Sequence, residues 1–184
     1  MKLLYSATIM KIILDSNKID KIITDLAKSI VSAMPKQVEL AVIGIRSRGE
    51  ILGQRLGAKL SEILEKDVPC GTLDITLYRD DINDPQGQGQ PQVRSTEIGF
   101  NIDDKIIILA DDVLHTGRST RAAMDALIDL GRPQAIKLAV LIDRLGREFP
   151  IQADFVGHKV DVPTDESVQV NFVESDGEDQ VIVE

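Results

Sequence analysis

The sequence predicts an α/β domain with a mainly parallel sheet, and the alternation of two kinds of segment carries this prediction. Continuous apolar runs at 38–45, 105–110 and 135–142 are typical of strands that are covered on both faces. The first two runs are followed, at 49–64 and 118–130, by apolar residues at three- and four-residue spacing, as in amphipathic helices. Strands and helices that alternate in this way form a parallel sheet flanked by helices.

Further elements are expected towards both ends of the chain. A short strand at 12–14 precedes a helix whose apolar positions recur from Ile19 to Ile30 and which Pro35 ends. Asp15 and Ser16 are candidates for the cap of this helix. The remaining strand candidates are 73–78, 151–156 and the alternating residues Val168, Val170 and Phe172, which indicate a half-exposed strand.

Residues 80–97 turn polar and are rich in Gln, Gly and Pro. Such a segment cannot pack into a core, and a long loop inside a compact domain is often functional. We therefore expect a lid over a site, with a plain hairpin tip as the alternative.

Length and composition restrict the class of protein. The chain has 184 residues, 43% hydrophobic and 28% charged, which suits one globular domain and excludes a collagen-like or wholly disordered chain. No apolar run approaches the roughly 18–20 residues that cross a bilayer, so no membrane association and no secretory signal are expected. The single cysteine, Cys70, cannot form an internal disulfide, which favours the reducing cytoplasm.

The net charge of −9 is concentrated at the C-terminal end. Residues 161–184 hold eight acids and no lysine or arginine, whereas the rest of the chain has 22 acids against 21 bases. A balanced body with an acidic tail does not by itself indicate a nucleic-acid-binding protein.

The strongest functional signal is the segment from Ile107 to Thr120. A buried strand there ends at Asp111 and Asp112, at the edge of the sheet where ligands of open α/β sheets bind. The hydroxyl-rich turn at 116–120 then begins a helix, whose free N–H groups and positive dipole end can hold a phosphate. Carboxylates that accept hydrogen bonds from vicinal hydroxyls beside a phosphate site predict a ribose 5-phosphate ligand.

Two other interpretations of this segment are weaker. The two acids could belong to the magnesium-binding strand of a P-loop NTPase, which requires a glycine-rich loop that ends in Lys and Ser or Thr. The nearest candidate, at 44–49, is followed by Glu50 and Ile51, so the lysine and the hydroxyl are missing. A solvated acidic turn would leave the hydroxyl-rich turn unexplained.

The segment resembles the phosphoribosyl pyrophosphate (PRPP) motif of type I phosphoribosyltransferases. Three further stretches, at 42–49, 73–81 and 122–133, narrow the match. Together they resemble the family of bifunctional pyrimidine operon attenuation regulators and uracil phosphoribosyltransferases, over about residues 11–157. The stretch at 74–81 is the most specific part, since sister enzymes share the PRPP motif.

This resemblance implies the type I phosphoribosyltransferase fold, in which helices flank a mainly parallel twisted sheet and a small hood covers the base site. It implies a phosphoribosyltransferase domain, hood included, at 11–160. Residues 161–184 are then an acidic C-terminal segment with one or two edge strands, and residues 1–10 an N-terminal extension. The family also forms homo-oligomers.

The implied activity is the conversion of uracil and PRPP to UMP and pyrophosphate. The implied second function is to sense UMP or UTP and to attenuate transcription by binding a pyrimidine-operon leader RNA. The alternative is a phosphoribosyltransferase for another base, a purine or orotate, without RNA binding. The absence of cations from the last 24 residues argues against RNA binding, because each phosphate contact needs a cation.

The resemblance also assigns the PRPP contacts. The pyrophosphate loop comprises Arg46, Ser47, Arg48 and Gly49, and in the family it often contains a cis peptide that does not precede proline. An arginine suits bidentate phosphate contacts, although Arg46 and Arg48 could instead be solvated surface charges. The other implied contacts are Asp111, Asp112, Val113, Leu114, His115, Thr116, Gly117, Arg118, Ser119 and Thr120.

Catalysis is implied for Arg79, Asp111 and Asp112, with Arg79 neutralising pyrophosphate. Mg²⁺ would arrive bound to PRPP and lie near the two aspartates, with no direct protein site. Arg144, Phe155 and Val156 resemble the region that covers the base. Phe155 could stack on a pyrimidine or belong to the core, and the sequence leaves both open.

Overall fold

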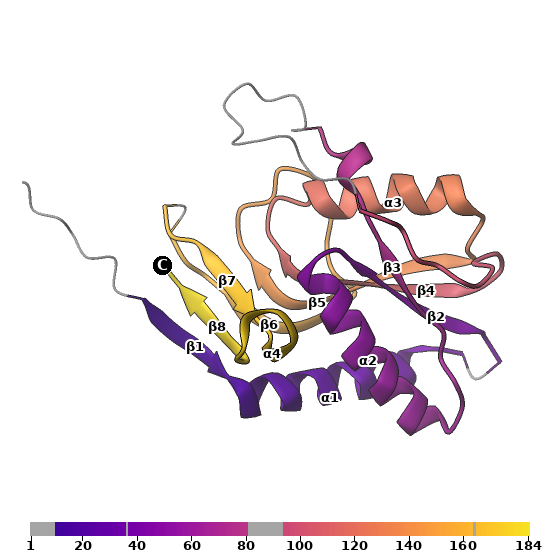
Figure 1. Cartoon of the computed structure of the whole chain (residues 1–184), viewed down its shortest axis with the longest axis horizontal. Helices are drawn as coiled ribbons and strands as arrows, with labels where there is room; N and C mark the ends of the chain where they lie inside the picture. Colours follow the sequence, from indigo (N-terminus) through magenta and orange to yellow (C-terminus); the bar gives the residue numbers. More distant parts are fainter. Residues whose placement is uncertain (1–9, 36, 81–93, 164) are drawn as a thin grey trace, which may run out of the picture.

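The computed structural model describes residues 10–35, 37–80, 94–163 and 165–184. A parallel sheet of five strands lies at its centre, in the order β3-β2-β4-β5-β6 (Figure 1). Its strands are β2 (Leu40–Ile45), β3 (Cys70–Leu73), β4 (Ile106–Leu114), β5 (Ala135–Arg144) and β6 (Phe155–Val160). The middle strand, β4, pairs Ala110 with Gly44 on one side and with Ala139 on the other. The expected parallel α/β sheet is confirmed.

Helices cover both faces of this sheet, as Figure 1 shows. One core contains α1 (Ser16–Ala33) and α2 (Arg48–Leu64), and the other contains α3 (Arg118–Leu130). Successive residues of β4 alternate between the cores: Ile108 packs with α1 and α2, whereas Ile107 and Leu109 pack with α3. This alternation explains the continuous apolar runs, because both faces are buried. None of the helices in the described ranges has the length and apolarity of a membrane span.

The first helix begins and ends where the sequence places it. The carboxylate of Asp15 accepts a hydrogen bond from the Lys18 amide at 2.9 Å, which is the interaction of an N-cap. α1 ends at Ala33, two residues before Pro35.

A second, antiparallel sheet joins the two ends of the described chain. It comprises β1 (Lys11–Asp15), β7 (Val168–Asn171) and β8 (Gln180–Val183), in the order β1-β8-β7. The four-residue helix α4 (Val173–Asp176) connects β7 to β8. β7 is an edge strand as expected for the tail, but β8 lies in the middle, because its other neighbour is β1.

Two predicted strands have different bounds in the structure. The expected strand at 73–78 ends at Leu73, and a 3₁₀ helix, η1 (Thr76–Tyr78), follows. The cause is Asp74, whose carboxylate accepts hydrogen bonds from the amide and the hydroxyl of Thr76 and so turns the chain out of the sheet. The strand expected at 151–156 begins only at Phe155, because the Asp154 side chain takes the Leu138 amide that a strand residue would otherwise pair.

The central strand is longer than its apolar run. β4 continues beyond 105–110 to Leu114, because its pairing with β5 extends as far as Leu114 opposite Asp143. The acidic pair, Asp111 and Asp112, therefore lies within the strand and not at its end. Most of the expected lid, residues 81–93, lies outside the described residues; at its far end Glu97 pairs with Thr72.

Candidate active site

The acidic pair lies near the carboxyl end of the central strand. Asp111 is buried, with 7% of its surface exposed, and its Oδ1 accepts a hydrogen bond from the Asp112 amide at 3.1 Å. Burial raises the pKa of the Asp111 carboxyl well above its ordinary value, and the charge of Asp112 adds to this. Burial also raises the pKa of Asp112, while the charge of Arg48 opposes that rise.

The turn between β4 and α3 lines a small hollow that is partly open to solvent. At this turn Gly117 adopts a left-handed backbone with φ of 90°, which lets α3 begin at Arg118. The hollow is lined by eight of the ten predicted motif residues: Asp111, Val113, Leu114, His115, Thr116, Gly117, Ser119 and Thr120. The structure thus gathers the predicted ribose phosphate contacts around one small polar space at the N-terminus of a 13-residue helix.

One side chain in the lining lacks a hydrogen bond. Thr120 is 2% exposed, and its Oγ1 has no partner within the described part of the chain. A buried hydroxyl without a partner costs free energy, so a site that retains one has a place for a ligand acceptor. An oxygen of a 5′-phosphate would be such an acceptor.

The predicted pyrophosphate loop lies directly beside the acidic pair. The Arg46–Ser47 peptide is cis, and α2 begins at Arg48. A Cβ added to Gly49 would lie 2.7 Å from the Ala110 carbonyl oxygen and 3.1 Å from the Asp111 carboxylate, so only glycine permits this approach. The start of α2 therefore packs against β4 at the acidic pair.

Both arginines of the loop are paired, so neither is a free solvated charge. The Arg46 side chain is 17% exposed and contacts Glu97 at 3.0 Å and Glu50 at 3.7 Å. Arg48 binds Asp176 of α4 and is 31% exposed. Each arginine therefore has a carboxylate partner, and a contact of either with pyrophosphate stays a prediction.

The other predicted residues lie around this centre or in the core. Arg118, the first residue of α3, is paired with Glu148 and Asp80 and stacks on Phe149. Arg79 directly follows η1. Arg144 ends β5, is 6% exposed, and donates to the Pro163 carbonyl oxygen at 3.0 Å.

The two remaining base-site candidates differ in burial. Phe155 is 9% exposed and packs in the core with α1 and α2, which fits the core alternative that the sequence left open. Val156 is partly buried against the opposite core. A contact of either residue with a base stays a prediction.

Sequence reasoning missed Arg147. Its guanidinium donates to the carbonyl oxygens of Leu114, His115, Arg144 and Ile151, and it also binds the Asp143 carboxylate. It thus ties the ends of β4 and β5 to the loop that follows β5, beside the turn at 115–117. The sequence feature that could have indicated this role is the spacing of four residues between Asp143 and Arg147, just beyond the end of β5.

His115 lies against this same loop. A Cβ on Gly146 would lie 2.7 Å from its Nε2, so the glycine leaves room for the imidazole. Burial lowers the pKa of His115, and the charges of Arg144 and Arg147 lower it further. These effects favour the neutral imidazole beside the turn.

Comparison with known proteins decides the family. A phosphoribosyl transferase domain model matches residues 10–175. The chain belongs to this family. Within it, the chain is 47% identical over 171 residues to the bifunctional protein PyrR of Pelotomaculum thermopropionicum, which covers 93% of each chain. It is 52% identical over 156 residues to that of Thermus aquaticus, which covers 85% of each.

Solved structures of phosphoribosyltransferases share the fold. The hypoxanthine phosphoribosyltransferase of Trypanosoma cruzi superposes with a TM-score of 0.69 at 19% identity, covering 94% of this chain and 95% of that one. A hypoxanthine-guanine phosphoribosyltransferase of Bacillus anthracis gives 0.67 at 19%, covering 94% and 96%. The type I phosphoribosyltransferase fold and the family expected from the sequence are confirmed.

Replacing Asp111 by Asn should stabilise the free protein. The pKa of this carboxyl is higher in the folded chain than its ordinary 3.8, so its ionisation opposes folding once the pH exceeds the unfolded value. We expect Asp111→Asn to gain about 1–2 kcal/mol at pH 7 in denaturant unfolding, and the gain to vanish below about pH 4. The exposed Asp161→Asn serves as the control. A loss of stability at pH 7 would contradict the assigned cost of burial.

Proposed function

We propose that this chain is a uracil phosphoribosyltransferase and, in addition, a uridine-nucleotide-sensing regulator of pyrimidine genes. The observation that carries the enzyme assignment is the polar hollow at the start of α3, next to the buried Asp111 and the half-buried Asp112. The choice of uracil as the base rests on the similarity to proteins named bifunctional protein PyrR, at 47–52% identity over most of the chain. This similarity favours the two joined functions over a phosphoribosyltransferase for another base alone.

The geometry suits transfer of a phosphoribosyl group. In the reaction the bond from the anomeric carbon to pyrophosphate breaks and a bond to a uracil nitrogen forms, with loss of that nitrogen's proton. The carboxylates of Asp111 and Asp112 would accept hydrogen bonds from the ribose hydroxyls, and the amides at the start of α3 would hold the 5′-phosphate. Because pyrophosphate leaves readily once its charge is neutralised, positioning and electrostatics suffice without a covalent nucleophile.

The chain's own donors suit Mg²⁺ that is carried in by PRPP. Asp111 and Asp112 offer two carboxylates, and Mg²⁺ commonly keeps phosphate and water ligands beside one or two of them. When bound there, the ion would neutralise charge on the pyrophosphate.

A base-by-base assay tests the enzyme assignment. The full chain is incubated with PRPP, Mg²⁺ and uracil, orotate, hypoxanthine or guanine in turn, and nucleotide formation is measured. We expect UMP from uracil and at least tenfold slower product formation with the other bases. Faster conversion of orotate or a purine would show that this base, and not uracil, is the substrate.

Thr120→Val tests the phosphate site without disturbing the free protein. Valine keeps the shape of threonine, and the lost hydroxyl has no partner in the described structure, so the thermal unfolding temperature should stay the same or rise. UMP should bind about tenfold more weakly because one phosphate contact is lost, whereas uridine should bind as before. If the affinities for UMP and uridine fell equally, Thr120 would not be a contact of the 5′-phosphate.

The charge of the tail does not oppose the regulatory function as strongly as the sequence indicates. Three of its eight acids, Glu174, Asp176 and Asp179, are ion-paired with Arg48 and Arg55 of α2. A filter-binding titration with a pyrimidine-operon leader RNA, with and without UMP, tests this function. We expect salt-dependent binding that UMP strengthens. No binding, or binding that is indifferent to UMP, would leave the enzyme function alone.

A further inference from the structure

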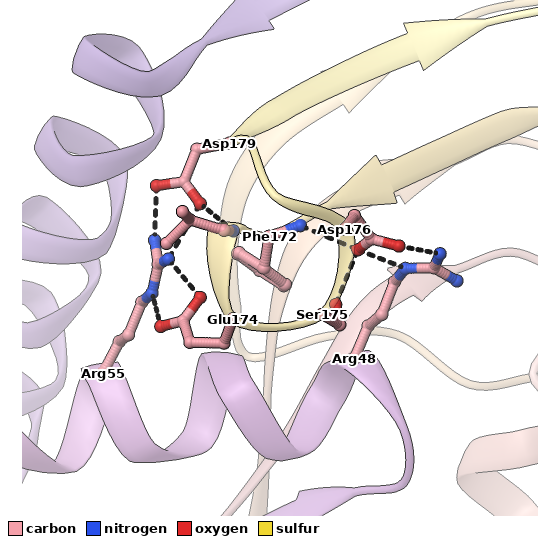
Figure 2. A network of polar contacts seen from close by, with 8 residues as sticks. Arg48, Arg55, Phe172, Glu174, Ser175, Asp176 and Asp179 are labelled. Carbon is pink, nitrogen blue, oxygen red and sulfur yellow. Dashed lines mark hydrogen bonds and ion pairs between the residues drawn. The ribbon is translucent and has the colours of Figure 1, made fainter.

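The acidic C-terminal segment is fastened to α2 at two points, which Figure 2 shows together. At the first point, Arg55 binds two carboxylates in bidentate fashion. Its distances to Glu174 are 2.8 and 2.6 Å, and both distances to Asp179 are 2.8 Å. The guanidinium carbon also lies 4.9 Å from the ring centroid of Phe172, which is fully buried. Paired charges in a network over a buried ring make this a firm anchor.

At the second point, Asp176 holds Arg48. The Arg48 Nε and Nη2 atoms donate to the two carboxylate oxygens at 3.3 and 2.8 Å. The carboxylate is itself oriented, because it accepts the Phe172 amide at 3.0 Å and the Ser175 hydroxyl at 2.6 Å. The Arg48 guanidinium lowers the pKa of Asp176 to about 2, so the pair is ionised at neutral pH.

The two anchors attach to different parts of α2. Arg55 is two helical turns into α2, whereas Arg48 is its first residue and lies between the cis peptide and Gly49. Gly49 packs against the backbone of β4 at Asp111. The second anchor therefore connects the C-terminal sheet to the predicted pyrophosphate loop, and through it to the acidic pair.

We propose that Asp176 is a positioning residue for PRPP: it fixes the Arg48 side chain as a strut, so that the loop presents its backbone N–H groups to the pyrophosphate. The inference rests on the proposed function and refines it, because the guanidinium of Arg48 then serves the fold and not the ligand. The expected direct contact of this side chain with pyrophosphate is replaced by a contact of the loop's backbone.

The geometry favours the strut over a direct ligand. Asp176 engages the Nε–Nη2 edge of the guanidinium, which is one of the edges that a phosphate could take in a bidentate contact. Asp176 cannot follow Arg48 toward a ligand, because Glu174 and Asp179 hold its segment to Arg55. A loop that is held in place before binding loses less conformational freedom when the ligand arrives.

A double-mutant cycle tests the proposal. The dissociation constant of PRPP with Mg²⁺ is measured by calorimetry, and KM and kcat by UMP formation, for the parent, Asp176→Asn, Arg48→Gln and the double variant. We expect each single variant to weaken PRPP binding and raise its KM about two- to tenfold, with kcat and the KM for uracil nearly unchanged. The double variant should be no worse than either single one, because both break the same strut.

Changes of opposite direction in PRPP affinity for the two single variants would indicate instead that Arg48 is a direct ligand. If Arg48 binds pyrophosphate directly, Asp176→Asn frees a cation and tightens PRPP binding, while Arg48→Gln weakens it far more than tenfold. Either result, or additive effects in the double variant, overturns the proposal. So does an Asp176→Asn variant that binds PRPP as the parent does.

Two further measurements separate the possible failures. Glu178→Gln removes the same charge from an exposed position in the same turn, where it contacts Gln180, and should leave PRPP binding unchanged. If Glu178→Gln weakened PRPP binding as much as Asp176→Asn does, the effect would come from net charge alone and the proposal would be wrong. A parent chain that binds PRPP but does not convert uracil refutes only the proposed function, whereas a parent that binds no PRPP refutes both.

Discussion

The pairing of β4 with β5 beyond the apolar run is the constraint on which the site depends. Pairing continues to Leu114 opposite Asp143, so the strand carries both carboxylates to the rim before the chain turns. The turn, the left-handed Gly117 and the first residues of α3 then follow without an intervening loop. A shorter ladder would leave the acidic pair on a flexible connection, and its distance from the turn at 115–117 would no longer be fixed.

Several groups at this rim are held at a cost to the unliganded fold. Asp111 is an ionisable group buried next to another carboxylate, and Thr120 buries a hydroxyl without a partner in the described structure. Such arrangements persist when the surrounding structure enforces them, and they collect at functional sites. Here the enforcement comes from two close contacts: α2 against β4 at Gly49, and the Arg147 guanidinium across the ends of β4 and β5.

The parts of the fold that the sequence predicts are those that depend on local chemistry. The apolar runs, the Asp15 cap and the helix that ends before Pro35 each follow from neighbouring residues and lie where expected. The motif from Ile107 to Thr120 succeeds for the same reason, since strand, turn and helix are consecutive. The Asp74 turn was locally readable as well, but the β-rich composition of the stretch after it favoured a strand.

The missed features join residues that are far apart in the chain. Nothing near Arg147 in the sequence indicates that its acceptors include Leu114 and His115. The acids of residues 161–184 likewise do not indicate in the sequence that their partners are arginines of α2. Periodicity likewise detects a half-exposed strand near residue 170, but it does not reveal that the next strand pairs with the beginning of the chain. Contacts of this kind depend on the assembled sheet, which one sequence read by itself does not supply.

The pairing of Lys11 with Val183 has a consequence for how the molecule is made. During synthesis the helices and parallel strands of the centre emerge while β1 still lacks β8, its neighbour in the described sheet, because β8 follows these elements in the chain. The edge of this early strand is then open to other chains until β8 has been made. Closure of this small sheet is a long-range event of high contact order, so it belongs among the late steps of folding.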